Sequence, residues 1–257
     1  ELGRAHQRDP QTLQCSWWRR PKPARASDTT HAMAVAVAIS DAEALIDPLD
    51  RVGLNVRVLD CPAYGLLRAI QRETLEAQSI QAIVDIGHAA ALLVLVVEGV
   101  VIYQRAMPQC GLAALIQEIA EKNNLDPQHI PALLRRLGGK LRADDEAPVR
   151  LQLTAMARRV SSFVNHLATE VQRSLSYAQH QYPQWRVEHL WLTGGATNLK
   201  TLQQQIREQV GMTVSIYDSF ARLNPQSPMD LKAIAPSFAL AIGLADGDPA
   251  DEQAIAS

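Results

Sequence analysis

The stretch that decides the fold runs from Val187 to Val210 and reads VEHLWLTGGATNLKTLQQQIREQV. A short apolar run ends at Gly194-Gly195, and a long amphipathic segment follows. Neither glycine has a Cβ atom, so the backbone can take positive φ and a flat ligand can pack on the peptide plane. The first turn of a following helix would offer unpaired N–H groups to the same ligand. Because an ordinary strand-to-helix turn has the same pattern, a ligand site here needs a second site to support it.

The composition describes a globular protein of a general kind. The chain has 257 residues, of which 47% are hydrophobic, enough for one large domain or two modest ones. A formal net charge of -2 gives no reason to expect nucleic acid or acidic lipid as a partner. The three cysteines form no CxxC pair, which favours reduced thiols in the cytosol and argues against a zinc site.

The sequence offers no candidate for a transmembrane helix. The uncharged stretch in its most apolar region, Ala89 to Val97, is far shorter than the roughly 20 residues that a membrane-spanning helix needs. The chain begins at Glu1 without the apolar segment of a signal peptide, so we expect an N-terminally incomplete protein. At the other end, residues 246–257 are acidic and small, and we expect them to be a disordered tail.

The first 80 residues are expected to contain two different units. Residues 1–30 hold three prolines and few periodic apolar positions, which predicts an irregular segment with one short strand near Trp17-Trp18. Residues 31–80 are predicted to form an inserted βαβα subdomain. Its expected elements are strands over residues 32–39 and 54–59, a helix capped by Ser40-Asp41 and ended by Gly53, and a helix opened by Pro62.

The basic aromatic cluster Trp17-Trp18-Arg19-Arg20 lies within the first of these units. Contact with membrane headgroups or an acidic partner is one interpretation of such a cluster. An edge strand with solvated arginines is the interpretation we favour.

Residues 81–245 are predicted to form the half-molecule of an actin-like, RNase H-like α/β core. Three consecutive strands are expected over residues 82–86, 91–97 and 100–105, with Glu98-Gly99 as a tight turn. Alternating elements then follow. They are helices over residues 111–123, from residue 126 to Gly138-Gly139 and over 151–179, the strand before Gly194-Gly195, a helix over 199–210 capped by Gly211, a strand over 213–217 and a helix over 237–244.

Asp85-Ile86-Gly87 is the second site that the glycine pair requires. It follows the first strand of the core, so both turns would lie at carboxyl ends of sheet strands and face one cleft. An Asp leaving a strand can hold a hydrated magnesium ion, and the Gly would let backbone N–H groups approach phosphate oxygens. An Asp-x-Gly alone is commonly a hairpin turn. The downstream Gly-Gly-Ala favours a ligand site over that alternative.

Four segments of the chain resemble, in their order along the sequence, the PilM proteins of type IV pilus assembly, members of the actin-like ATPase superfamily related to FtsA. AIVDIGHAAALLVLVVEGVVIYQRAMPQCGLAALIQEI resembles the second phosphate motif of the family, and LWLTGGATNLKTLQQQIREQVGMTV resembles its adenosine motif. IAPSFALAIGLA resembles the closing helix, and VAISDAEALIDPLDRVGLNVRVLDCPAYGLLRAI resembles the inserted subdomain. Together they cover most of residues 32–245.

The resemblance implies a nucleotide site that holds ATP or ADP, with or without magnesium. Asp85 and Gly87 would face the phosphates, and Gly194, Gly195 and Ala196 would face the adenosine. These five positions match the motifs of the family one by one.

The resemblance also implies a basic residue beside the base, which would be Arg135 or Arg136, with Arg136 as our choice. The family usually has lysines on a helix at this point. A solvated helix face explains the two arginines equally well.

Two departures from the family bear on phosphate binding. The family places threonines or serines directly after Asp-x-Gly, whereas this chain has His88-Ala89-Ala90-Ala91 and lacks those hydroxyls. The first phosphate loop would lie upstream of Glu1. We therefore expect weak phosphate coordination, no catalytic residue, no metal-ligating residue and at most a weak ATPase.

The function implied by the resemblance is that of a cytoplasmic scaffold, peripheral to the inner membrane. PilM-type proteins bind nucleotide, other pilus assembly proteins and the short cytoplasmic tail of a bitopic membrane partner, PilN, with a groove that involves the inserted subdomain. One alternative is an active ATPase or small-molecule kinase of the same superfamily. Another is a degenerate scaffold that binds no nucleotide. The sequence contains no P-loop, GxSxG, GxGxxG or HExxH motif that would favour another enzyme class.

Overall fold

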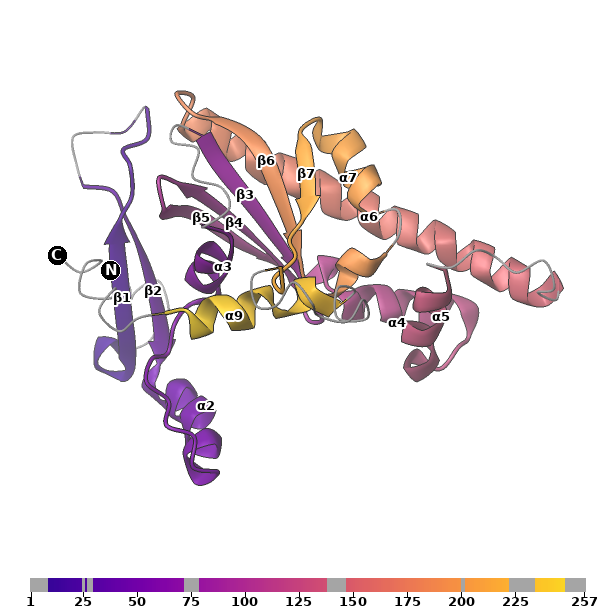
Figure 1. Cartoon of the computed structure of the whole chain (residues 1–257), viewed down its shortest axis with the longest axis horizontal. Helices are drawn as coiled ribbons and strands as arrows, with labels where there is room; N and C mark the ends of the chain where they lie inside the picture. Colours follow the sequence, from indigo (N-terminus) through magenta and orange to yellow (C-terminus); the bar gives the residue numbers. More distant parts are fainter. Residues whose placement is uncertain are drawn as a thin grey trace.

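A five-stranded mixed β-sheet is the centre of the computed structural model (Figure 1). The structure describes residues 9–24, 26, 30–71, 79–137, 147–199, 202–221 and 234–247. In these residues the strand order of the sheet is β5-β4-β3-β6-β7. The strands are β3 (Ser79–Ile86), β4 (Ala91–Val97), β5 (Val100–Met107), β6 (Arg186–Thr193) and β7 (Thr213–Ile216). The α/β class predicted from the sequence is confirmed.

The pairing of the strands follows the predicted order of elements. β3, β4 and β5 form an antiparallel meander, and β6 and β7 add to β3 in parallel. Glu98 and Gly99 join β4 to β5 with φ angles of 50° and 77°. Two consecutive residues at positive φ match the right-handed twist of a tight hairpin, as the Glu-Gly pair predicted.

One face of the sheet is covered by α4 (Leu112–Asn123), α6 (Ala147–Gln181) and α7 (Leu202–Val210). The long helix α6 runs across this face and beyond it (Figure 1). The apolar positions that were predicted at helical spacing are buried. They are Leu153, Met156, Val160, Phe163, Val164, Leu167, Val171 and Leu175.

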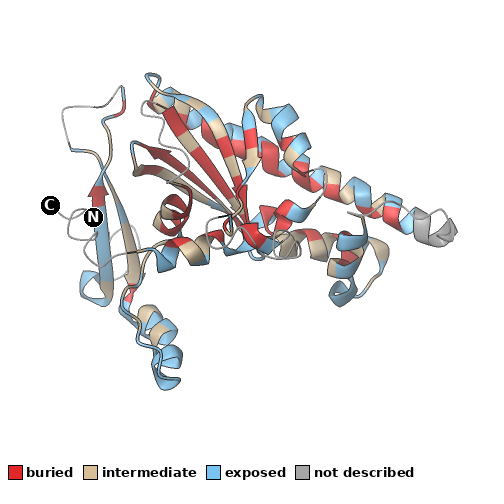
Figure 2. Cartoon of the chain, in the orientation of Figure 1, coloured by how far each residue is buried: buried red, intermediate tan, exposed pale blue. Residues whose placement is uncertain are grey.

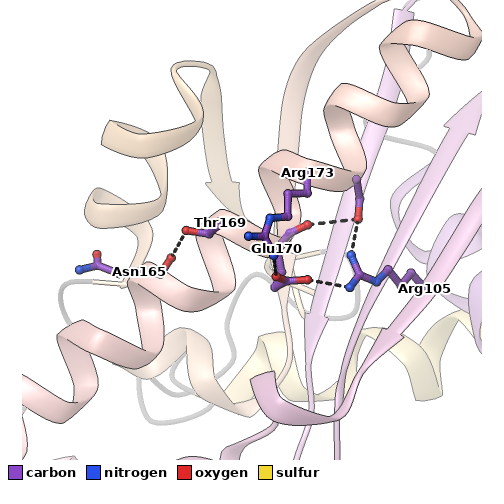
Figure 3. A network of polar contacts seen from close by, with 6 residues as sticks. Arg105, Asn165, Thr169, Glu170 and Arg173 are labelled. Atoms are coloured by element: carbon purple, nitrogen blue, oxygen red, sulfur yellow. Dashed lines mark hydrogen bonds and ion pairs between the residues drawn. The ribbon is translucent and has the colours of Figure 1, made fainter.

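A polar network joins α6 to the edge strand β5 (Figure 3). Arg105 of β5 donates from Nη2 to Glu170 Oε2 at 2.6 Å and from Nη1 to Ser174 Oγ at 3.2 Å. Arg173 donates to the other oxygen of Glu170 at 2.5 Å. Burial alone would raise the pKa of Glu170, but the hydrogen bond and charge of Arg105 hold that pKa below its ordinary value. The pair therefore fixes β5 against α6 through an ionised carboxylate.

The opposite face of the sheet packs against α3 (Pro62–Gln71) and α9 (Ala239–Ala245). The two helices cross very closely at a pair of glycines, because a Cβ atom on Gly243 would lie 1.7 Å from the Gly65 carbonyl oxygen. Arg68 Nε donates to the Gly243 carbonyl at 2.8 Å, and Arg68 also pairs with Asp60. This crossing holds the C-terminal helix under the sheet (Figure 1).

A separate two-stranded antiparallel sheet, β1 (Leu13–Arg19) with β2 (Ala32–Ala38), lies beside the core. Trp18 of β1 is buried, donates its indole N–H to the Val101 carbonyl at 2.8 Å and meets the ring of Tyr64 edge-on at 4.9 Å. Trp17 remains exposed. The predicted strand at Trp17-Trp18 is thus confirmed, and one of its two tryptophans is a packing anchor.

The expected βαβα order of the subdomain is wrong in its second strand. Residues 54–59 are described by the structure and form no strand, although Leu54 and Leu59 alternate with polar residues. Their exposed fractions, 58% and 44%, show the cause. Among the described residues no strand pairs with this segment, and alternation without a partner strand does not make a strand. The expected division at residue 80 stays a prediction.

The helix before this segment, α2 (Ile39–Arg51), also differs from the expectation. Its N-cap is Ala38, which offers no side-chain hydrogen bond, so the predicted cap at Ser40-Asp41 is wrong. Ile39 follows directly from β2, leaving no room for a cap outside the helix. Gly53 ends the helix with φ of 81°, as predicted. The structure describes every residue of α2, and none is buried (Figure 2).

Some sequence-based expectations lie outside the described residues. They are the beginning of the irregular segment at residues 1–8, the helix end at Gly138-Gly139 and most of the expected tail, residues 248–257.

Candidate functional site

The two turns singled out from the sequence lie side by side at one edge of the sheet. β3 and β6 are parallel neighbours, and Asp85 is the register partner of Thr193. Thr193 Oγ1 donates a hydrogen bond to Asp85 Oδ1 at 2.6 Å. The order of elements predicted this meeting, because the carboxyl ends of parallel strands share an edge. Asp85-Ile86-Gly87 and Gly194-Gly195 therefore form one candidate site.

Gly194 is required by the neighbouring strand. It has φ of 90°, and a Cβ atom at this position would lie 2.5 Å from the Ile86 carbonyl oxygen. Its N–H donates to the Pro236 carbonyl at 2.9 Å, which joins the turn to the segment before α9. The missing Cβ of Gly194 thus serves the close approach of β3, whereas the sequence had suggested the approach of a ligand.

Gly195 differs from Gly194 because a Cβ atom there would meet its neighbours at ordinary van der Waals distances, without a clash. A Cβ atom there would have Leu112 Cδ1 at 3.5 Å and Ser237 Oγ at 3.8 Å as its nearest neighbours. Gly195 is also partly exposed. An apolar methyl group and a hydroxyl therefore border a stretch of bare backbone, which is a surface that suits a flat ring or a ribose.

Gly195–Asn198 forms a 3₁₀ turn, and Leu199, where the helix was expected to begin, is not helical. The structure describes α7 over Leu202–Val210. The Ala196 side chain is buried in the core, so only its backbone can face a ligand. Thr197 is buried as well and donates from Oγ1 to the Gly194 carbonyl at 2.8 Å. The unpaired N–H groups that a helix directly after the glycines would have offered are replaced by this turn.

The loop after Gly87 is closed by its own hydrogen bonds. The Gly87 N–H donates to the Ala90 carbonyl at 3.1 Å. The carbonyls of Gly87 and His88 accept from Leu112 and Ala113 at 3.0 and 2.8 Å. Leu112 and Ala113 stand at the beginning of α4, so the loop occupies the end of this helix. The Gly87 N–H that the sequence suggested for phosphate is already in use.

Asp85 is the acidic group of the site. Burial raises the pKa of its carboxyl above the ordinary value, and the hydrogen bond from Thr193 opposes this rise in part. Among the residues that the structure describes, no three His, Cys, Asp or Glu side chains converge to hold a metal ion. A magnesium ion would thus have Asp85 as its protein ligand and would depend otherwise on water and phosphate oxygens.

The two arginines predicted beside the base lie on a helix that carries none of the other predicted site residues. Arg135 and Arg136 are exposed on α5 (Ile130–Leu137), whose main packing partners are α4 and α6. In Figure 1, α5 lies beyond α4 on the side away from the sheet. The structure brings Asp85, Gly87, Gly194 and Gly195 together, and their ligand roles and that of Arg136 stay predictions.

Two surface depressions of about 1000 and 600 Å³ lie at the other end of β6. Both include Val187, near the first residue of that strand, and Met212, just before β7. Because the glycine pair follows the last residue of β6, these depressions are separate from the candidate site.

Comparison with known families finds that the profile described as type IV pilus assembly protein PilM matches residues 20–246. Among solved structures, a PilM-PilN type IV pilus biogenesis complex is 20% identical with a TM-score of 0.75, over 95% of this chain and 69% of that chain. The ethanolamine utilization protein EutJ from Carboxydothermus hydrogenoformans is 15% identical with a TM-score of 0.56, over 81% of this chain and 61% of that chain.

MreB5 of Spiroplasma citri bound to ADP is 11% identical with a TM-score of 0.51, over 85% of this chain and 68% of that chain. These likenesses show that the fold is actin-like. In the described part of the chain, no helix combines the length and the apolar character needed to cross a membrane.

Proposed function

The chain belongs to the family of the type IV pilus assembly protein PilM, and we propose that it is a scaffold component of the pilus assembly platform. In this proposal it binds an adenine nucleotide at the edge formed by the turns after β3 and β6. It also binds the cytoplasmic tail of a PilN-type partner and works in the cytoplasm against the inner membrane.

One observation carries the nucleotide part of the proposal. Asp85 and Thr193 join the two turns by a hydrogen bond, and the partly exposed Gly195 follows Thr193 by two residues. A structurally similar protein, MreB5, is described as bound to ADP, which supports an adenine nucleotide as the ligand. Leu112 and Ser237 lie at contact distance from the Cβ position of Gly195, and they offer an apolar and a polar neighbour to a nucleoside.

The surface of α2 supports the partner part of the proposal. The structure of a PilM protein in complex with PilN is similar to this chain. Here α2 and its C-cap residue carry exposed apolar side chains about one turn apart, with Leu45 61%, Leu49 41% and Val52 71% exposed. A helix with one apolar stripe and no buried residue offers a surface for an incoming peptide. We therefore assign the tail to this stripe.

A scaffold accounts for the site better than an ATPase or kinase does. Such an enzyme needs a base in the cleft and intact phosphate loops. Asp85 accepts a hydrogen bond from the Thr193 hydroxyl, and the loop after Gly87 carries alanines at residues 89–91. These residues hold two strands together and give a phosphoryl group few contacts.

The test is capture of the full chain by an immobilised synthetic peptide with the sequence of the partner's cytoplasmic tail. We expect saturable binding that falls at least tenfold, about 1.4 kcal/mol, in the double variant Leu45→Glu/Leu49→Glu, because charge disrupts an apolar contact. Asp47→Ala on the other side of α2 is the matched control and should bind like wild type. No binding by wild type would contradict the partner assignment, and equal binding by the double variant would exclude the α2 stripe.

A further inference from the structure

We propose that this site recognises the nucleoside of its ligand and distinguishes little between adenosine, AMP, ADP and ATP. The inference rests on the proposed nucleotide binding and concerns the loop of residues 87–90. One N–H group of that loop and two at the adjoining end of α4 bond to the protein itself.

The first reason is that backbone N–H groups near the loop already have hydrogen-bond partners in the protein. A phosphate beside a loop and a helix end is normally held by N–H groups that have no partner in the protein. Here the Gly87 N–H is bonded to Ala90, and the N–H groups of Leu112 and Ala113 at the beginning of α4 are bonded to Gly87 and His88. Three donors are therefore already paired, and a phosphate would have to break these bonds to use them.

The second reason is that the loop is packed in its closed form. A Cβ atom on Gly111 would lie 2.6 Å from the Ala89 carbonyl carbon and 2.7 Å from the Ala90 nitrogen. Gly111 therefore lets the loop lie directly on the N-cap of α4. Opening the loop to expose its donors would give up this contact and the two hydrogen bonds that accompany it.

The third reason is that the side chains of the site offer few hydrogen-bond donors to a phosphate. The loop carries Ala89 and Ala90, so it has no hydroxyl in these positions to donate to a phosphate. The Thr193 hydroxyl donates to Asp85 at 2.6 Å and is likewise in use. When ionised, the Asp85 carboxylate repels phosphate oxygens unless a cation lies between them.

The nucleoside side of the site has none of these obstacles. Gly195 presents backbone that is partly exposed, and Leu112 Cδ1 and Ser237 Oγ stand 3.5 and 3.8 Å from the position of an absent Cβ atom. Burial of a ring against Leu112 gives affinity that does not depend on the number of phosphates. The free energy of binding should therefore come mostly from the part that all four ligands share.

The experiment is calorimetric titration of the full chain with adenosine, AMP, ADP and ATP, each with and without magnesium. We expect four dissociation constants within about threefold of one another. ADP or ATP binding more than about tenfold tighter than adenosine would overturn the inference and leave the proposed nucleotide binding intact. Failure of all four to bind would overturn the proposed nucleotide binding, and the inference with it.

A second variant tests whether the loop is the cause. Ala89→Ser/Ala90→Thr adds two hydroxyls to the exposed side of the loop, and we expect the preference for ATP over adenosine to rise at least threefold. Ala106→Ser adds one at an exposed site on β5 and should leave the preference unchanged. An unchanged preference in the double variant would overturn the assignment to the loop.

Discussion

Thr193 and Asp85 stand opposite each other on two parallel strands, and the Thr193 hydroxyl donates to the Asp85 carboxylate at 2.6 Å. The two residues are 108 positions apart in the sequence. Their contact makes one unit of the two turns from which we infer a nucleotide site. Several consequences of this arrangement, and of the packing that supports it, can be measured.

The two glycines of the turn should differ in their tolerance of a methyl group. Gly194→Ala places Cβ 2.5 Å from the Ile86 carbonyl at a positive φ, so we expect the free energy of unfolding to fall by at least about 2 kcal/mol. Gly195→Ala is the matched control, and its Cβ would be 3.5 Å from Leu112, so the change should stay within about 0.5 kcal/mol. Urea unfolding measures both. Equal losses in the two variants would contradict the different roles given to them.

Asp85 should make the protein less stable as the pH rises. Burial raises the pKa of its carboxyl in the folded protein above the ordinary value of 3.8. The stability that the protonated carboxyl contributes is fully present below pH 3.8 and is lost as the pH rises through the folded pKa. Asp85→Asn keeps an acceptor for Thr193 without the charge. We expect this variant to unfold at a higher urea concentration than wild type at pH 7. The difference between the two urea midpoints should narrow toward pH 4. If the difference in urea resistance between the variant and wild type widened on acidification, the predicted direction of the pH effect of Asp85 would be wrong.

The crossing of α3 and α9 should depend on Gly243 more than on Gly65. A Cβ on Gly243 would collide with backbone, 1.7 Å from the Gly65 oxygen, and we expect Gly243→Ala to cost about 3 kcal/mol. A Cβ on Gly65 would meet the flexible tips of Leu240 and Leu244 at 2.9 and 3.0 Å. Helix propensity partly offsets this strain, so Gly65→Ala should lie within about 1 kcal/mol of wild type. Chemical denaturation that finds Gly65→Ala the more harmful would refute this account of the crossing.

The ion pair in Figure 3 should stabilise the protein at neutral pH and lose this effect in acid. Although burial works to raise it, the pKa of Glu170 is held below the ordinary 4.5 by the hydrogen bond and charge of Arg105. Stability from this group is therefore present above pH 4.5 and lost as pH falls through the folded pKa. Arg105 is 40% exposed, so solvent screens the ion pair and weakens it. We expect Arg105→Gln to lower the free energy of unfolding by about 1 kcal/mol at pH 7.

The control for this prediction is Arg159→Gln, whose partner Glu118 lies 3.2 Å away with both side chains about two-fifths exposed. An exposed pair contributes little, so this change should stay within about 0.5 kcal/mol. If Arg105→Gln and Arg159→Gln are equally mild at pH 7, the burial of Glu170 has no energetic role.

The order of strands and helices in the core could be predicted from sequence because each element carries its own periodicity. The apolar positions of α6 recur at helical spacing, and the Glu98-Gly99 turn selects a hairpin. From that order alone the turns after β3 and β6 were expected at one edge, and the structure places Asp85 opposite Thr193.

What could not be predicted depends on neighbours that are distant in sequence. Leu54 to Leu59 alternates like a strand but finds no partner in the described residues. A glycine is needed at position 194 because the backbone of Ile86 leaves no room for a Cβ atom. The loop after Gly87 is held by hydrogen bonds from α4. Nothing near Trp18 in the sequence indicates that its indole reaches Val101. Periodicity reports which face of an element is buried, and it does not report what covers that face.

The central claim is that the partly exposed backbone at Gly195 receives the nucleoside of an adenine nucleotide. Calorimetric titration of ADP into wild type and Gly195→Val tests it most directly, with Thr213→Val, an exposed change at the far end of the sheet, as the control. We predict saturable binding by wild type and Thr213→Val, and binding at least tenfold weaker by Gly195→Val, about 1.4 kcal/mol, with its unfolding transition retained. Equal ADP affinity in wild type and Gly195→Val, or no binding by wild type, would contradict the claim.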